Sequence, residues 1–449
     1  GLGDVYKRQI LVTSLFNRCT DHVDYEAIEG YQITSEIYFQ QEADYDAALV
    51  GTYDVLQWLF FNIQLGAIAS EITLCGGESA TDYIGIQQID DMTHYPENNV
   101  LRQIWQFLYE GVNRANYMEE NKANIDFEGK EAMYGEVYFL RAYYYFELVK
   151  FFGDVPLFTE ARLTAGQAGT LTRTPKDEVY AQIELDLQNA IASLPNSQSQ
   201  VGRVNKYTAY ALLGKVLLYQ DKFAEAASAL DNVIGVYSLV SDYGSQFLRF
   251  GENGPESVFE IQYSNQSNWY DWGCAHCSEG NYAIIMNGPR GWSGPEYAQG
   301  WSFNVPTEEF YNSFEEGDSR RDATVLDIEA FAAATGASYT EGYDHTGYFN
   351  NKYIPRAGES GGQTELNYLT NFRIIRYSDV LLMAAEAYNR GGIDDGLAQE
   401  FLNQVRRRAF GGDDNDISAS GSALTDAIWE ERKFEPVSYT HLTLPTTRL

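Results

Sequence analysis

Large and small residues recur at one fixed spacing in two separate parts of the chain. In the first part they are Tyr210, Leu213, Gly214, Leu217, Ala226 and Leu230, and in the second Ala384, Ala385, Tyr388, Leu397 and Phe401. This is the spacing of a tetratricopeptide (TPR) repeat, in which two antiparallel helices interlock through small residues. Because one pair cannot bury its own apolar face, several pairs must stack. The spacing therefore predicts an all-α-dominated fold with TPR-like helix pairs in a superhelical scaffold.

The best-defined helix start in the sequence is Thr174-Pro175-Lys176-Asp177. Thr174 can cap a helix, Pro175 suits the first helical position, and Asp177 completes a capping box. An apolar stripe at helical spacing then continues to Pro195, which ends the helix. The stripe contains Val179, Ile183, Leu187, Ala190, Ile191 and Leu194. We expect an amphipathic helix whose apolar face packs on a neighbour.

Between residues 241 and 370 the composition changes, with more Gly, Asn, Ser and aromatic residues. Only short runs such as SVFEIQY, at residues 257–263, resemble strands. Long irregular stretches inside a compact protein usually carry function. We therefore expect a loop-rich, strand-poor ligand-binding insertion between two helical parts of the scaffold, at about residues 38–240 and 371–435.

Both ends of the chain differ in character from the rest. Residues 1–9 and 437–449 resemble translated sequencing-adapter sequence, so we leave these foreign flanks out of the fold. The expected single domain spans residues 20–436. It contains no run of about 18 apolar residues that could span a bilayer. The net charge of −33 repels nucleic acid, which we exclude as a partner, and favours a neutral or cationic ligand.

Residues 10–19, ILVTSLFNRC, are apolar up to Cys19. Such a run resembles the remnant of a bacterial lipoprotein signal, in which the final Cys receives the lipid. Asn17 and Arg18 stand where small residues are expected, which departs from the pattern. The alternative is a coincidental apolar start.

Several stretches, taken in order, resemble the SusD/RagB family. They are residues 104–121, 134–158, 174–195, 202–226, 315–324, 372–390, 402–410 and 428–435. The resemblance implies a lipoprotein anchored on the exterior face of the outer membrane. It further implies a partner, a SusC-like TonB-dependent transporter, to which the protein delivers glycans or peptides.

The resemblance also implies that the ligand site draws on residues 71–83 and 269–301. Sugar C–H faces pack on aromatic rings, whereas sugar hydroxyls need directed polar groups. The candidate ligand-binding residues are therefore Trp269, Tyr270, Trp272, Trp292, Glu71, Asp82 and Tyr83. Loop packing is an equally open interpretation of the first three. Trp301, beside the apolar run FNVP, is expected in the core.

Three other functions remain open: a peptide-binding member of the same family, a TPR-type interaction scaffold, and a secreted glycoside hydrolase. A serine hydrolase is excluded, although Gly358-Glu359-Ser360-Gly361-Gly362 has the form of a nucleophile elbow. That mechanism needs a His after the Ser, and the only one is His441 in the suspected foreign flank. We expect no enzyme activity.

The sequence predicts no metal or cofactor. Cys274 and Cys277 are spaced like a redox pair or half of a zinc site, but no second pair is present. A local disulfide or two free thiols is the favoured interpretation, and Cys75 is expected to be a loop or core thiol. The acidic run at residues 413–416 lacks the ligand spacing of a calcium loop, so structural calcium is possible but not indicated.

Overall fold

The computed structural model describes residues 38–59, 65–266, 272–360 and 366–435. The α-helices are α3 (Glu42–Gln57), α5 (Ile84–Asp90), α6 (Asn99–Glu120), α7 (Lys130–Phe152), α8 (Ala165–Ala168), α9 (Lys176–Ser193), α10 (Lys206–Leu218), α11 (Phe223–Leu230), α12 (Ala283–Met286), α13 (Glu308–Asn312), α14 (Arg320–Thr324), α15 (Ile328–Thr335), α16 (Tyr377–Arg390), α17 (Asp395–Phe410) and α18 (Ser422–Phe434). Three 3-10 helices are η1 (Gly244–Phe247), η2 (Arg249–Gly251) and η3 (Trp272–Cys277).

The strands are short and pair in twos, always antiparallel. The pairs are β1 (Thr73–Gly76) with β4 (Phe303–Pro306), β2 (Ser257–Ile261) with β8 (Phe372–Arg376), β3 (Arg290–Ser293) with β6 (Ser338–Thr340), and β5 (Val325–Asp327) with β7 (Tyr348–Asn350). The predicted strand at SVFEIQY is β2. The predicted helix-dominated fold is confirmed.

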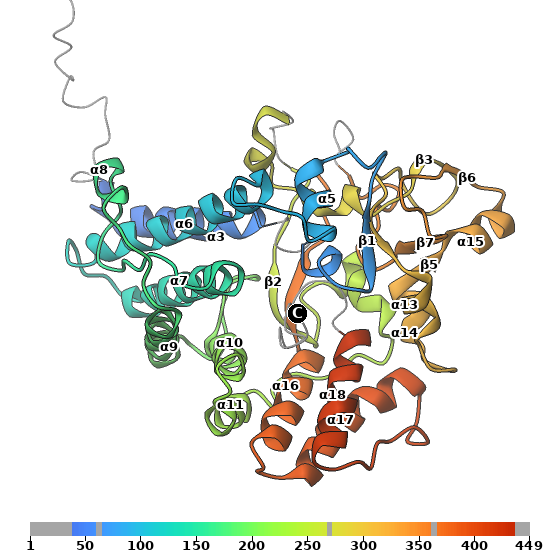
Figure 1. The fold of residues 1–449 in the computed structure, drawn as a ribbon. Helices are drawn as coiled ribbons and strands as arrows, with labels where there is room; N and C mark the ends of the chain where they lie inside the picture. The colour runs from blue at the N-terminus through green and yellow to red at the C-terminus, as the bar shows by residue number, and fades with distance from the viewer. Residues whose placement is uncertain (1–37, 60–64, 267–271, 361–365, 436–449) are drawn as a thin grey trace, which may run out of the picture.

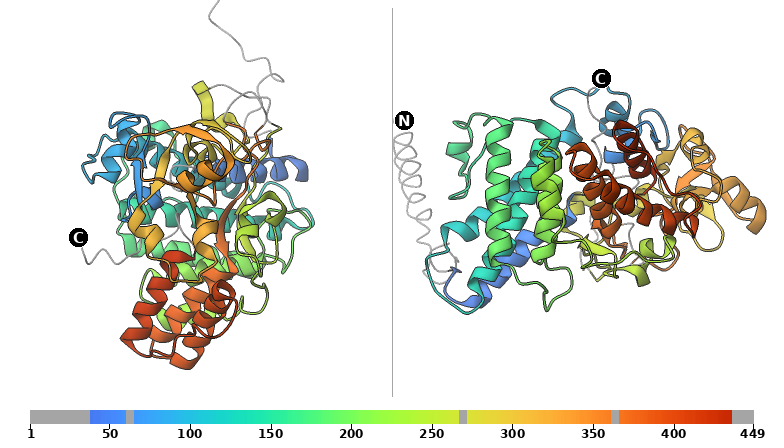
Figure 2. Two further views of the ribbon diagram at one scale, coloured as in Figure 1. Left: turned by 90° about the vertical axis from the view of Figure 1, so that its right-hand side faces the viewer. Right: turned by 90° about the horizontal axis from the view of Figure 1, so that it is seen from below.

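Most of the long helices gather in two groups around the central β2–β8 pair (Figure 1). Helices α3 and α6 to α11 lie on one side, α16 to α18 lie below, and the remaining strand pairs lie on the other side with α13 to α15. Seen from below in Figure 2, the helices of the first group run side by side. In the described part of the chain, none of the helices combines the length and apolar character needed to cross a membrane.

Small residues set the close approach of the helix pairs, as the repeat spacing predicts. A Cβ placed on Gly214 of α10 would lie 2.5 Å from Cγ of Leu230 on α11, so only Gly fits. In the second pair, Tyr388 of α16 contacts Phe401 of α17 with ring centroids 5.7 Å apart. Leu397 does not join this contact and is 43% exposed. It lies in the first turn of α17, where Ala398 takes the buried position.

Helix α9 ends before Pro195 as predicted, but its start differs from the expected capping box. Pro175 occupies the N-cap and no side chain of the cap residue bonds the helix. Thr174 instead exchanges two backbone hydrogen bonds with Val155. The first free N–H, on Lys176, donates to Oδ1 of Asp154 at 2.8 Å. A distant carboxylate therefore supplies the cap, which local sequence cannot indicate.

Helix α7 is buried on nearly all sides, and it carries several of the 34 tyrosines of the chain. The hydroxyl of Tyr134 donates to the Met118 carbonyl at 2.7 Å, that of Tyr144 to the Thr52 carbonyl at 2.6 Å, and that of Tyr145 to the Phe158 carbonyl at 2.7 Å. A buried hydroxyl needs such a partner. These rings therefore fill the core while their hydroxyls connect α7 to neighbouring helices and a loop.

Helix α18 is held to the rest of the fold by a buried network of charges. Glu435, at its C-cap, is fully buried and lies between Arg320 of α14, Arg376 of β8 and Arg408 of α17. Glu431, one turn earlier, pairs with Arg320 as well. The network joins α14, β8, α17 and α18, and its Glu435 partners lie 27, 59 and 115 positions away in the sequence.

Candidate functional site

The two segments expected to form the ligand site lie together in the structure. Strand β1 pairs with β4, and the N–H of Gly77, just beyond β1, donates to the Ser302 carbonyl at 2.7 Å. Arg290, the first residue of β3, donates through Nη2 to Oδ2 of Asp82 at 2.7 Å. Its Nη1 lies 3.7 Å from Oε2 of Glu78. Residues about 200 positions apart therefore form one surface region.

A third segment completes this region and was not predicted. The N–H of Tyr343 donates to the Gly77 carbonyl at 2.8 Å, and the Tyr343 side chain is 37% exposed. The available signal in the sequence was an aromatic residue in a loop, between Gly342 and Asp344. We call Glu78, Asp82, Arg290, Trp292 and Tyr343 the Asp82–Arg290 site.

The backbone around the site is strained. Four non-glycine residues here have positive φ: Tyr83 (52°), Ser302 (58°), Asn304 (55°) and Asp344 (53°). Each such residue costs on the order of 1–3 kcal/mol and persists only where the surrounding structure enforces it. Gly76 also has φ of 70°, and a Cβ there would lie 2.1 Å from the Ser302 carbonyl oxygen. Such strain clusters at functional sites.

Asp82 holds one carboxylate oxygen in place and keeps the other available. Its Oδ2 accepts hydrogen bonds from the Glu78 N–H at 2.8 Å and from Arg290 at 2.7 Å. None of the described residues donates a hydrogen bond to Oδ1, and the Asp82 side chain is 30% exposed. An oriented acceptor of this kind suits a ligand hydroxyl, because the carboxylate loses little freedom on binding.

Trp292 lies two residues after Arg290 on β3, but an irregularity in strand pairing between Arg290 and Ser293, with Gly291 at φ of 59°, interrupts the regular alternation of faces there. Its half-buried ring contacts Tyr297 and Phe331, with centroids 5.9 and 6.0 Å away. The indole N–H is buried without an acceptor among the described residues. Trp292 therefore packs into a small apolar cluster next to Arg290 in sequence, and its place in the site is a prediction.

The other predicted residues are placed as follows. Tyr83 is half-buried, contacts Phe303 at 6.4 Å between ring centroids, and burial raises its pKa. Glu71 is exposed just before β1. Trp269, Tyr270, the two flanks and Cys19 lie outside the described residues, as does the side chain of Trp272. Trp301 packs against Tyr282 beside the main core, as expected.

Acidic groups surround the base of the site. Burial raises the pKa of Asp90 to about 6, and Asp91 and Asp344 contribute in the same direction. Asp90 Oδ2 accepts the Cys75 N–H at 2.8 Å. Cys75 is a buried thiol, as expected, and burial raises its pKa. These carboxylates disfavour an anionic ligand.

Cys274 and Cys277 form a disulfide, one of the two states that the sequence left open. In the acidic run at residues 413–416, Asp416 pairs with Arg407 at 2.5 Å, while Asp413 and Asp414 are exposed. That arrangement is typical of a solvated loop.

Comparison with known proteins identifies the family. A family model described as starch-binding and associating with the outer membrane matches residues 70–218, and the SusD family model matches residues 255–436. SusD-like protein P2 of Formosa agariphila is 30% identical over 433 residues, 90% of this chain and 83% of the relative.

Two solved structures have the same fold over most of their length. A laminarin-binding SusD-like protein is 35% identical, with a TM-score of 0.80 over 88% of this chain and 89% of that one. Surface glycan-binding protein A from Bacteroides thetaiotaomicron, solved with laminarihexaose, is 29% identical, with a TM-score of 0.78 over 88% and 87%. The chain therefore belongs to the SusD family.

Proposed function

We propose that this protein binds a laminarin-type glucan at the Asp82–Arg290 site and does not hydrolyse it. The observation that carries the proposal is the Asp82 carboxylate, oriented by Arg290 and the Glu78 N–H in a region to which three segments contribute. Similar proteins whose names state laminarin or laminarihexaose binding support the choice of glycan.

The arrangement suits a neutral sugar chain. Asp82 Oδ1 accepts a hydrogen bond from a glucose hydroxyl, and Arg290 keeps the carboxylate in that orientation. In this proposal the C–H face of a sugar ring packs on the exposed part of Tyr343 and on the half-buried Trp292. The surrounding carboxylates repel sulfated or uronic acid chains.

A panel of polysaccharides tests this proposal. In affinity electrophoresis we expect laminarin to retard the protein, and starch, xylan and alginate to retard it less or not at all. After overnight incubation with laminarin, the release of reducing sugar should equal that of a buffer control. Hydrolysis above that control contradicts a pure binding function. Retardation by none of the glucans favours a peptide ligand.

The proposal includes delivery of the glycan to a SusC-like TonB-dependent transporter in the outer membrane, with a lipid on Cys19 as the anchor. Family membership supports the outer-membrane location. In cells that carry the complete gene, the protein should fractionate with the outer membrane and incorporate labelled fatty acid. The Cys19→Ser variant should lose both properties. Labelling that persists in the variant excludes Cys19 as the lipidated residue.

A further inference from the structure

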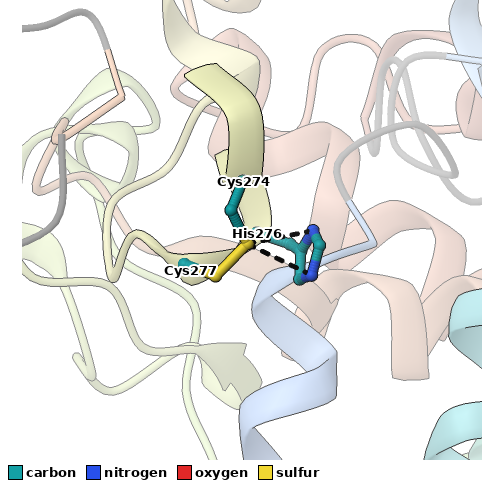
Figure 3. The surroundings of a disulfide bond; sticks show 3 residues. All are labelled: Cys274, His276 and Cys277. Carbon is teal, nitrogen blue, oxygen red and sulfur yellow. Dashed lines mark hydrogen bonds between the residues drawn. A yellow bond between two sulfur atoms is a disulfide. The ribbon is translucent and has the colours of Figure 1, made fainter. Parts of the chain in front are cut away.

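The segment Cys274–Cys277 brings three metal-binding side chains together on η3 (Figure 3). The two sulfurs form a disulfide, and His276 Nε2 lies 3.4 Å from Sγ of Cys274. One donor atom from each of the three residues lies within 4.8 Å of the others. Cys274 and His276 are half-buried and Cys277 is exposed, so an ion can reach them from solvent.

The scaffold, and not the disulfide, orients the imidazole. The His276 ring packs on Trp58, just after α3, and on Phe107 of α6, with centroids 4.9 and 5.3 Å away. Trp58 and Phe107 also contact each other at 5.4 Å. Because these two rings belong to the helical scaffold, the imidazole keeps its position when the sulfur–sulfur bond is broken.

We propose that reduction of the Cys274–Cys277 disulfide converts this segment into a Zn²⁺ site with two thiolates and one imidazole. A dithiol reductant supplies two electrons, the sulfur–sulfur bond breaks, and the reductant closes into its own disulfide. Zn²⁺ then displaces one proton from each thiol to solvent and binds the neutral imidazole. Water takes the fourth position.

The existing distances suit that product. Zn–S bonds of about 2.3 Å and Zn–N bonds of about 2.0–2.1 Å place neighbouring sulfur and nitrogen ligands roughly 3.5 Å apart in a tetrahedral site. The observed separation of 3.4 Å between Cys274 Sγ and His276 Nε2 already matches this value. The two sulfurs have to move apart, and Cys277 Sγ, which lies within 4.8 Å of the other two donor atoms, has to reach the same spacing from the imidazole. The inference is independent of the glycan proposal, since it uses none of the same residues.

The test uses the full chain with Cys19→Ser, reduced with dithiothreitol and desalted without oxygen. Cobalt(II) serves as the spectroscopic probe, because thiolate-to-cobalt charge transfer reports sulfur ligation directly. We expect one cobalt ion per reduced chain, displaced by one Zn²⁺, and no such band in the oxidised protein. Zn²⁺ should raise the melting temperature of the reduced protein and leave that of the oxidised protein unchanged.

Matched variants separate this site from other binding. His276→Phe keeps an aromatic ring against Trp58 and Phe107 but removes one metal ligand. Mutating a residue that only orients a ligand typically lowers metal affinity by about 10- to 100-fold, so we expect the cobalt affinity of this variant to fall by more than about tenfold. Cys75→Ala should bind as before. The double variant Cys274→Ser with Cys277→Ser shows by circular dichroism whether the fold survives without the disulfide. The proposal is wrong if the fold survives in the double variant while the reduced parent gives no charge-transfer band with cobalt. It is also wrong if His276→Phe binds cobalt as tightly as the parent.

Discussion

Replacing Arg320 with methionine is expected to lower the free energy of unfolding by about 3–5 kcal/mol, the cost of removing one partner from a buried ion network. The Arg320 side chain is fully buried. It donates to Asp318 at 2.6 Å and to Glu435 at 3.1 Å, and it also pairs with Glu431. Methionine fills similar space but leaves these carboxylates without the guanidinium.

The next residue is a matched control. Arg321 is 41% exposed and pairs with Asp322, which is 78% exposed. An exposed pair contributes about 0–1 kcal/mol, so Arg321→Met should change little. Urea denaturation followed by circular dichroism compares the two variants at pH 7. Similar losses in both would mean that the buried network contributes no more than a surface pair.

Acidification gives a second measurement of the same network. Burial by itself raises the pKa of Glu435. The neighbouring Arg408, Arg376 and Arg320 outweigh burial and hold this pKa well below its usual range. A carboxyl with a lowered folded-state pKa stabilises the fold above its unfolded pKa of about 4.3, and that stability is lost as pH falls below it. The difference between the parent and Arg320→Met should therefore shrink on acidification below about pH 4.

Replacing Asp82 with alanine is expected to weaken laminarin binding by about 10- to 150-fold. The estimate takes about 1.5–3 kcal/mol for a hydrogen bond to a charged group. Isothermal titration with laminarihexaose measures it, and Glu97→Ala, an exposed acid of the same charge, is the control. Asp82→Asn, which keeps the oxygen acceptor, should lose less than the alanine variant. Equal affinity in Asp82→Ala and Glu97→Ala would place the site elsewhere.

Substitution of Trp292 should also weaken laminarin binding, but the control has to account for the packing of its ring. Stacking of a sugar face on an indole contributes on the order of 1–3 kcal/mol, or roughly 5- to 150-fold in affinity. Trp292→Ala would also disturb the packing on Tyr297 and Phe331. Trp292→Phe keeps an aromatic ring in that cluster, so its melting temperature should stay close to the parent's while binding weakens. Trp301→Phe, beside the main core, should leave binding unchanged.

The helical scaffold was predictable because its determinants are local. Apolar residues at helical spacing, Pro195 as a stop and Gly214 opposite Leu230 are all visible within short windows of sequence. Two details differ from what these windows predicted, one of them because the partner lies 22 residues away and the other within a single helical turn. Asp154 caps α9 in place of Thr174, and Leu397 faces solvent because Ala398 takes the buried position.

The candidate site was predictable only as two segments, and only through the family resemblance. Asp82 and Arg290 are separated by 208 positions, and the third segment, with Tyr343, joins them through a backbone hydrogen bond at Gly77. Neither the two-residue spacing of a strand nor the periodicity of a helix indicates which loops meet. Tertiary packing decided this, because the antiparallel pairs β1–β4 and β3–β6 bring these loops into contact and hold their strained backbone.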